Sequence, residues 1–280
     1  MRASNGSGVM DPEERRDRMT EAASPPISGT HRWVSLMVHD LAASQEFYHG
    51  LFGWEFDEGP KQLGAYVRAL RDGHPVAGLG EITEGARRVV AWLPYIATRD
   101  ADATAATIRE SGGTVAVGPL DAEQVGRLAI AADPGGAAFG LWQGGPKRRS
   151  GPFPGAAGAP VWNELITFET RAVSTFYSTV FGYEAAPEKA LPPESDYLTL
   201  RLGERPIASI RGVAEAVPHD RGAHWLTYFS VPDVEEAVEE VKRLGGRQLT
   251  GPQVSPFGQW AQVTDPEGAP FAVIREAKRG

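Results

Sequence analysis

Residues 31–145 and 161–276 carry one motif twice, and this duplication constrains the fold of the chain more than any single residue does. Matched positions keep an almost constant offset, which is 129 residues between Trp33 and Trp162 and rises only to 133 further along. A period of this length is too long for a solenoid repeat, which spans roughly 20–50 residues, and has the size of a domain. The sequence therefore predicts a tandem pair of domains with one shared fold, as the length of 280 residues also suggests.

Each copy divides again into two halves with the same order of elements. Residues 33–38 alternate as a strand, and residues 42–51 place apolar side chains on one helical face. Gly53 follows where a left-handed backbone ends a helix. Strand-like runs at residues 65–70 and 76–82 complete the half. The second half repeats this plan from residue 93, and the second copy repeats both halves.

The chain therefore reads as four β-α-β-β-β units, an α+β class that forms two curved open barrels. The helices are expected to cover the convex side of each sheet, so a ligand site would face the concave side. The predicted boundaries are a disordered leader at 1–29, a first domain at 30–145, a Gly/Pro-rich linker at 146–160 and a second domain at 161–280.

Composition excludes several classes of partner. The net charge of −8 leaves no concentrated basic face for nucleic acid. No apolar run approaches the roughly 18 residues of a membrane span. The absence of cysteine excludes disulfides, thiolate metal sites and a cysteine nucleophile. We expect a cytoplasmic monomer or homodimer whose partner is a small molecule, with no nucleic acid and no membrane.

Three groups of residues carry a family resemblance. They are Val34-x-Leu36-x-Val38-x-Asp40-Leu41 with Phe47-Tyr48 and Leu51-Phe52-Gly53-Trp54, then residues 231–237 running to 244–246, and Asp265-Pro266-Glu267-Gly268. With them the chain resembles the vicinal oxygen chelate superfamily, which includes glyoxalase I, extradiol dioxygenases and bleomycin-resistance proteins. Its tandem form is most similar to the two-copy glyoxalase-like proteins of actinobacteria.

The resemblance also implies where a metal would bind, because enzymes of this superfamily chelate a divalent ion with His, Glu or Gln. The corresponding positions here are Trp33, Leu93 and Gly140 in the first copy and Trp162, Leu226 and Ala272 in the second. None of these side chains offers an oxygen, imidazole or thiolate donor. We therefore predict no metal and no cofactor. A register shift of one residue would instead bring His31, Glu164 or His224 near these positions.

Aromatic residues are the main candidates for ligand contact. The proposed lining consists of Trp33, Trp92, Trp162, Trp225, Trp260, Tyr66, Tyr197 and Tyr228. Such rings can stack on a planar apolar ligand. The alternative is that they fill the cores of the curved sheets, since alternation turns about half of any strand's side chains toward the helices.

Polar candidates are few. Glu164 lies two residues after Trp162 and so shares its face, and His224 precedes the strand of Trp225. We take Glu164 and His224 as tentative acid–base residues. The alternatives are that Glu164 faces a partly wet rim or pairs with an arginine, and that His224 is a surface histidine or one satisfied by its neighbours. Arg127 and Gln259 occupy matched positions and are candidates for polar lining.

The leading hypothesis is a metal-free binding protein for a bulky aromatic natural product or drug, serving sequestration, self-resistance or biosynthesis. The first alternative is a metal-independent tailoring enzyme that uses Glu164 and His224 on a similar ligand. The second alternative is a metal-dependent lyase of the glyoxalase type, whose metal site the alignment has misplaced.

Overall fold

The computed structural model describes residues 27–60, 64–82, 90–122, 126–144, 156–213 and 222–277. Residues 1–26 of the predicted leader (1–29) lie outside the described part of the chain. Residues 146–155 of the predicted linker (146–160) also lie outside it. The predicted domain boundaries stay predictions, although residues beside them are ordered by contacts. The amide of Gly29 donates to the carbonyl of Ala97 at 2.8 Å, and the Trp54 indole donates to the carbonyl of Gly158 at 3.0 Å.

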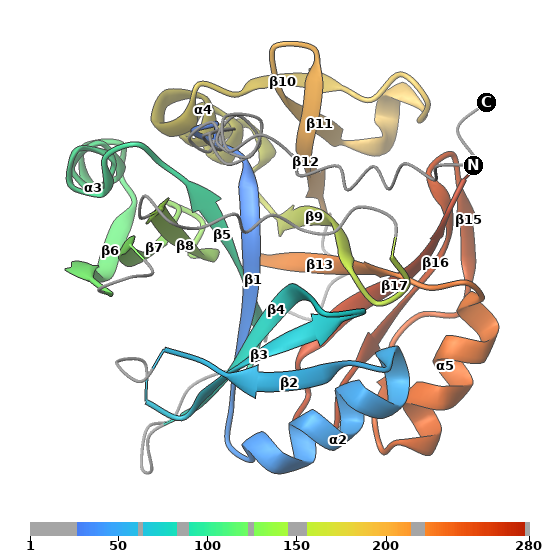
Figure 1. Cartoon of the computed structure of the whole chain (residues 1–280). Coiled ribbons are helices and arrows are strands. Elements are labelled where there is room, and N and C mark those ends of the chain that lie inside the picture. The colour runs from blue at the N-terminus through green and yellow to red at the C-terminus, as the bar shows by residue number, and fades with distance from the viewer. Residues whose placement is uncertain are drawn as a thin grey trace, which may run out of the picture.

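The first copy forms a sheet of eight described strands (Figure 1). They are β1 (His31–Val38), β2 (Glu55–Glu58), β3 (Tyr66–Arg71), β4 (His74–Glu81), β5 (Trp92–Ala97), β6 (Thr114–Asp121), β7 (Gly126–Ala132) and β8 (Ala138–Gly144). Their order across the sheet is β2-β3-β4-β1-β5-β8-β7-β6. The two halves of the copy meet where β1 runs antiparallel to β5.

The second copy repeats this arrangement in a sheet of nine described strands. They are β9 (Pro160–Thr167), β10 (Glu184–Pro187), β11 (Tyr197–Leu202), β12 (Arg205–Gly212), β13 (His224–Ser230), β14 (Arg247–Gln248), β15 (Gln253–Ser255), β16 (Gly258–Thr264) and β17 (Pro270–Glu276). The order is β10-β11-β12-β9-β13-β17-β16-β14, with β15 paired to β16. The predicted α+β class with four repeated units is confirmed, as two curved sheets that do not close into barrels.

Four α-helices of the described residues lie one to each unit, at α2 (Leu41–Phe52), α3 (Ala101–Glu110), α4 (Thr170–Phe181) and α5 (Val234–Arg243), and a short 3-10 helix, η3 (Pro193–Ser195), precedes β11. Their ends follow from the sequence. Asp40 caps α2 by accepting from the amide of Ala43 at 2.9 Å, and Gly53 ends the helix with a φ of 66° in the left-handed region. Within the described part of the chain, no helix is long and apolar enough to cross a membrane.

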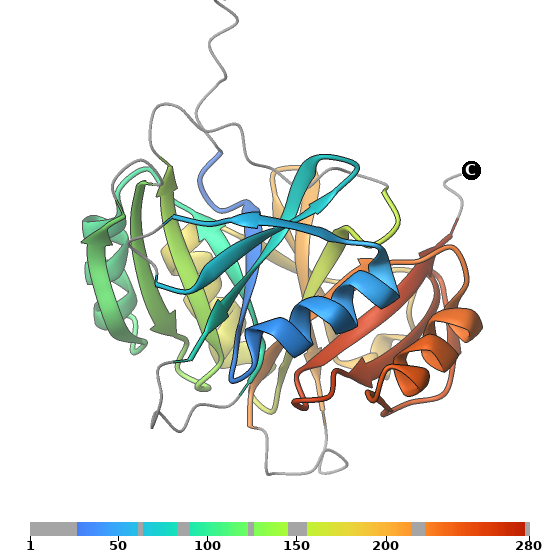
Figure 2. The same ribbon diagram turned by 60° about the horizontal axis from the view of Figure 1, so that its bottom comes forward.

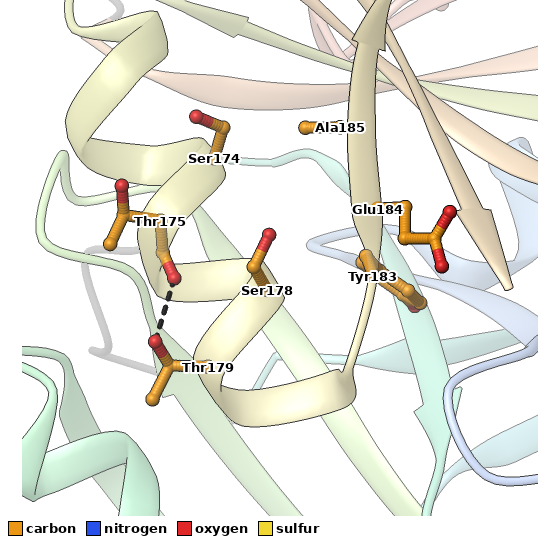
Figure 3. Close-up of a pocket in the computed structure, with 7 residues that line it drawn as sticks. All are labelled: Ser174, Thr175, Ser178, Thr179, Tyr183, Glu184 and Ala185. Carbon is orange, nitrogen blue, oxygen red and sulfur yellow. Dashed lines mark hydrogen bonds between the residues drawn. The ribbon is translucent and has the colours of Figure 1, made fainter.

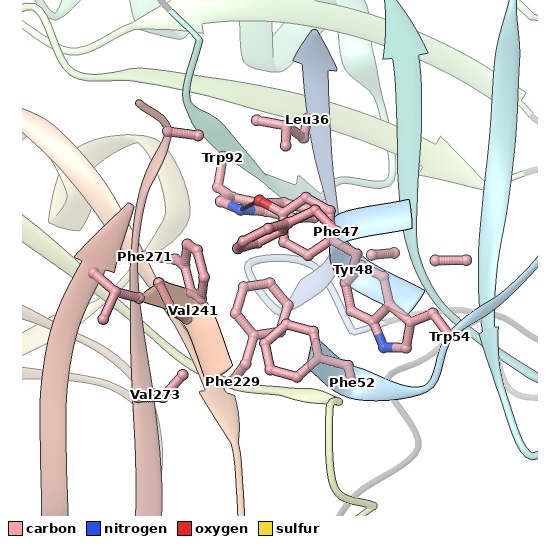
Figure 4. Packing of buried hydrophobic residues seen from close by; sticks show 14 of the residues in the cluster. Leu36, Phe47, Tyr48, Phe52, Trp54, Trp92, Phe229, Val241, Phe271 and Val273 are labelled. Atoms are coloured by element: carbon pink, nitrogen blue, oxygen red, sulfur yellow. Dashed lines mark hydrogen bonds between the residues drawn. The ribbon is translucent and has the colours of Figure 1, made fainter. Parts of the chain in front are cut away.

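Each sheet belongs to one copy, but the cores under the helices are shared between copies. Helices α2 and α5 run side by side, and one core joins the first half of copy one to the second half of copy two (Figure 2). Figure 4 shows Phe47 and Trp54 packed in this core against Phe229 and Phe271. The other core joins the two remaining halves through α3 and α4. The two copies therefore bury apolar surface against each other along their helix-covered faces.

Candidate functional site

The strand registers decide which side chains face away from the helices, because residues directly opposite on neighbouring strands project to the same face. Leu165 of β9 packs in a helix-covered core, so its neighbour Glu164 projects to the opposite face. We call this opposite face the inner face of each sheet. Glu164 lies opposite Ser209 of β12 and opposite Leu226 of β13.

Glu164 is the centre of a polar network on the inner face of the second copy. Its Oε1 accepts a hydrogen bond from Nε of Arg211 at 2.8 Å and another from the Tyr228 hydroxyl at 3.1 Å. The Ser209 hydroxyl donates to Oε2 at 3.5 Å and accepts from the Trp162 indole at 2.9 Å. The network thus connects β9, β12 and β13, and it holds the carboxylate in a fixed position.

Exposure differs sharply between the two charged members. The Glu164 side chain keeps 4% of its surface exposed, whereas the Arg211 side chain keeps 32%. Arg211 also lies over the ring of Trp260, with its Cζ 5.8 Å from the ring centroid, and Trp260 contacts Tyr228 at 5.8 Å between centroids. The guanidinium is therefore the charged group that a ligand on this face would meet first.

The charges of the network shift the pKa values of its members. Burial, and then the negative charge of Glu164, raises the pKa of the Tyr228 phenol well above its ordinary value. The same two causes raise the pKa of Tyr197, whose ring stacks on Phe257 at 6.0 Å. Burial alone would lower the pKa of Arg211, but the Glu164 carboxylate offsets it and the net pKa is raised. At neutral pH both phenols are hydrogen-bond donors and Arg211 is a cation.

The inner face of the first copy lacks this network. The registers place Ser35, Gly78 and Gly80 where the second copy has Glu164, Ser209 and Arg211. Tyr66 lies on this glycine surface and accepts a hydrogen bond from the Trp33 indole at 3.0 Å. A Cβ atom on Gly78 would stand 1.7 Å from the Tyr66 hydroxyl oxygen, so glycine is required there. The two copies share a fold but present different inner faces.

The positions where the superfamily would hold its metal do lie on the inner faces. In the second copy Trp162 is opposite Tyr228, and Tyr228 is opposite Ala272. In the first copy the ring of Tyr95 covers Gly140, leaving 2.2 Å to a Cβ built there. Indole, isobutyl and methyl groups offer no electron pair to a divalent ion. Within the described residues, no three His, Asp or Glu side chains gather as metal ligands, so the donor set does not fit a metal.

Four of the predicted lining residues lie on the inner face of copy two, namely Trp162, Tyr197, Tyr228 and Trp260. Trp33 and Tyr66 lie on that of copy one. His224 shares the face of Glu164, but it lies opposite Ile166, on the order of 7 Å further along the strands. Its Nδ1 lies 3.0 Å from the carbonyl oxygen of Gly222. The structure therefore does not bring His224 and Glu164 together as a hydrogen-bonded pair.

Trp92 and Trp225 lie in the helix-covered cores, which corrects their assignment to the lining. Each is 2% exposed, and its indole donates to a helix tyrosine, Tyr48 or Tyr177, at 3.1 Å. The reason is alternation, since Trp225 precedes inner-facing Leu226 by one residue.

Arg127 and Gln259 also lie on the helix side, away from the inner face. Arg127 pairs with Asp102 of α3 at 2.7 Å, and Gln259 donates to Glu235 of α5 at 2.6 Å. Their matched positions reflect a matched structural role. Arg127 joins β7 to the first turn of α3, and Gln259 joins β16 to the first turn of α5. Conversely, Arg211 and Ser209 were missed by the sequence analysis. The sequence did carry a signal for them. Ser209 and Arg211 lie two residues apart on β12, the strand beside β9, so both side chains project to the same face.

A surface pocket of about 640 Å³ lies elsewhere, between α4 and the chain around β10 (Figure 3). Most of its lining consists of helix hydroxyl groups. Those of Thr175 and Thr179 donate to the carbonyls of Arg171 and Thr175 one turn earlier. These hydroxyls are committed to the helix backbone, so the pocket offers little directed polar recognition.

Comparison with known proteins agrees with this architecture. A family model described as a glyoxalase-like domain matches residues 166–274, and one described as a bleomycin resistance protein-like N-terminal region matches residues 31–67. CFP32 of Mycobacterium tuberculosis, which carries a provisional glyoxylase name, is 32% identical over 254 residues, covering 89% of this chain and 95% of CFP32. The anthracycline biosynthesis protein DnrV of Streptomyces peucetius is 33% identical over 267 residues, covering 88% and 93%.

Solved structures show the same fold at low identity. The Mn(II)-bound glyoxalase from Novosphingobium aromaticivorans superposes with a TM-score of 0.60 at 17% identity, over 89% of this chain and 82% of that one. The 2,3-dioxygenase LapB from Pseudomonas sp. KL28 gives 0.60 at 15% identity, over 91% and 95%. These likenesses carry the fold and leave the chemistry to the residues of the inner face.

Proposed function

This chain belongs to the glyoxalase-like proteins of the vicinal oxygen chelate superfamily, and we propose that it binds a bulky aromatic small molecule without a metal ion. The observation that carries the proposal is the inner face of the second copy. Its metal positions are Trp162, Leu226 and Ala272, and the pair of buried Glu164 and partly exposed Arg211 lies among them. This face offers stacking surface and a cation where metal-dependent relatives would need a chelate.

The expected affinity follows from the rings of this face. Stacking geometry contributes roughly 0.5–1.5 kcal/mol per aromatic pair beyond the area buried. Trp162 and Trp260 together with burial of a three-ring ligand are enough to approach a Kd of about 1 μM, which corresponds to roughly −8 kcal/mol. DnrV is described as an anthracycline biosynthesis protein, which supports a polycyclic aromatic natural product as the ligand here. The role would be sequestration or service to a biosynthetic enzyme.

A metal-independent enzyme is the second candidate, because Glu164 is a buried carboxylate on the inner face of the second copy. Its geometry argues for an anchor more than for a base. Arg211 and Tyr228 donate to Oε1 and Ser209 donates to Oε2, and the Glu164 side chain is only 4% exposed whereas that of Arg211 is 32% exposed. A base must reach the proton that it removes at about 2.6–3.2 Å, and a ligand stacked over Arg211 leaves Glu164 behind the guanidinium.

A metal-dependent lyase, the third hypothesis, draws support from the glyoxylase name of CFP32 and from the Mn(II)-bound neighbour. The donor set of the inner faces does not fit it, as described above.

The test is a titration of tryptophan fluorescence with 1,8-dihydroxyanthraquinone in the presence of EDTA. We expect saturable quenching in the micromolar range. Absence of quenching, or quenching that appears only after Mn²⁺ is added, would contradict the proposal. Product analysis of the same mixture then separates binding from catalysis. Turnover that Glu164→Gln abolishes while affinity stays within a few-fold would establish the enzyme instead.

A further inference from the structure

We infer that Arg211 determines specificity on the inner face of the second copy, selecting aromatic ligands that carry a hydrogen-bond-accepting oxygen such as a quinone carbonyl or a phenolate. This inference rests on the proposed function and names the class of its ligand. It is carried by the difference between the two copies and by the orientation of the guanidinium.

The first copy shows that the fold does not require the Glu164–Arg211 pair. The same strands pair in the same registers there, with Ser35 in place of Glu164 and Gly80 in place of Arg211. Keeping the Glu164 carboxylate out of water is costly, and an ion pair that buries one of its charges is weak evidence of added stability. The first copy keeps the fold without this pair, and the second copy carries the pair on its inner face. We therefore attribute the pair to recognition of a ligand.

The geometry presents Arg211 to a ligand and keeps Glu164 behind it. Nε of Arg211 is held by the carboxylate at 2.8 Å, while about a third of the arginine side chain is exposed. A guanidinium has five N–H donors in a planar fork, so the two amino groups supply four more. Such a fork matches two adjacent acceptor oxygens, as in a carbonyl flanked by a phenol. The Arg211 Cζ also lies 5.8 Å from the centroid of the Trp260 ring, which adds a second contact on the guanidinium beside the Glu164 carboxylate.

The first copy also offers a matched control. Arg68 lies on its inner face, opposite Gly78, and its side chain is 32% exposed, as that of Arg211 is. Its acidic neighbour Asp57 is 3.9 Å away and 60% exposed, so Arg68 lacks the buried carboxylate that fixes Arg211. Arg68→Gln therefore removes an inner-face guanidinium of equal exposure from the copy in which we place no ligand.

The experiment compares two three-ring probes, 1,8-dihydroxyanthraquinone and anthracene, by quenching of tryptophan fluorescence in the full chain. The variants are Arg68→Gln and the double variant Glu164→Gln/Arg211→Gln, which removes both charges and leaves no lone buried carboxylate. Thermal unfolding without ligand checks that each variant is folded. For the wild type and for Arg68→Gln we expect the oxygenated probe to bind at least about tenfold more tightly than anthracene. The double variant should bind both probes within about threefold of each other, with the affinity for anthracene unchanged.

Three results would overturn the inference. They are a preference retained by the double variant, a preference lost in Arg68→Gln, and equal binding of both probes by the wild type. The last of these leaves the proposed function standing and removes only the specificity. If the wild type binds neither probe, the proposed function itself fails and the inference fails with it.

Discussion

Tyr48 of the first copy donates its phenolic hydrogen to the carboxyl of Asp265 in the second copy, across 3.1 Å. The Trp92 indole donates to the same phenol at 3.1 Å, so three buried groups form one chain of hydrogen bonds. An equivalent hydrogen bond runs from the second copy to the first, because Tyr177 donates to the Asp133 carboxyl of the first copy at 3.1 Å. These paired bonds lie within the shared cores and fix how the two copies sit against each other.

Loss of one inter-copy bond should be costly because it leaves buried polar groups without partners. Tyr48→Phe removes the donor to Asp265 and the acceptor of the Trp92 indole. We expect a loss of about 1–3 kcal/mol in the free energy of unfolding, measured with urea. Thr179→Ala, which removes an exposed hydroxyl on α4, should change it by less than about 0.5 kcal/mol. Equal effects of the two substitutions would show that the inter-copy bond contributes nothing.

The shared cores also predict how the copies behave when separated. A fragment of residues 27–150 would expose Tyr48 and Trp54, which pack against Phe271 and Phe229 of the other copy. We expect that neither this fragment nor the complementary fragment that carries the second copy unfolds cooperatively alone. The two fragments should form a folded complex when they are refolded together. Near-ultraviolet circular dichroism of the separate and mixed fragments measures this. A native-like spectrum from one fragment alone would argue that each copy is independent.

Much of the fold was predictable from the sequence, because duplication, alternation and helix caps are local signals. The four helices and the curved sheets follow from patterns around residues such as Asp40 and Gly53. The short edge strands β2 and β10 were not individually predicted, since Glu55–Glu58 and Glu184–Pro187 are mostly exposed and lack apolar alternation. The sharing of cores between copies depends on contacts between distant segments, which no local pattern contains.

The candidate site was only partly predictable for a related reason. The faces of Trp162 and Glu164 follow from their spacing of two residues, but the sides of Trp92 and Trp225 depend on strand register. A shift of one residue reverses such an assignment, and the sequence does not set the register of β13 against β9. The pairing of Arg211 with Glu164 depends on the position of β12 beside β9, which the sequence does not specify.

We expect His31 to make the stability of the folded chain depend on pH. Its ring is buried edge-on against Trp225 of the other copy, 5.2 Å between centroids, and neither ring nitrogen has a hydrogen-bond partner among the described residues. Burial lowers the pKa of His31 from 6.5 to about 4. Between these values the unfolded chain binds a proton that the folded chain does not. The contribution of neutral His31 to the free energy of unfolding is therefore complete above pH 6.5. As the pH falls toward 4, this free energy should decrease by roughly 3 kcal/mol.

The variant His31→Leu isolates this contribution. Burial raises the pKa of the Asp133 and Asp265 carboxyls, so their contribution is instead lost as the pH rises through their folded pKa. Both carboxyls remain in the variant, and their effect cancels in the comparison. Urea unfolding from pH 7 to pH 4 should show a smaller fall in stability for the variant than for the wild type. Parallel pH profiles would exclude His31 as the cause.

Metal retention tests the mapped chelate positions. Protein incubated with Mn²⁺ or Ni²⁺ and then dialysed should keep clearly less than one equivalent by elemental analysis, because Trp162, Leu226 and Ala272 offer no donor atoms. Stoichiometric metal that survives dialysis would mean that other residues form a chelate, and the binding hypothesis would have to be replaced.

The most direct test of the account compares two tryptophans at equivalent positions. Trp33 and Trp162 both lie on inner faces, but only Trp162 joins the network of Glu164 and Arg211. The measurement is the Kd of 1,8-dihydroxyanthraquinone by calorimetry for Trp162→Ala and Trp33→Ala. We predict that Trp162→Ala weakens binding by about 1–3 kcal/mol and that Trp33→Ala leaves it within about twofold. Equal losses, or a loss confined to Trp33→Ala, would contradict a ligand site in the second copy.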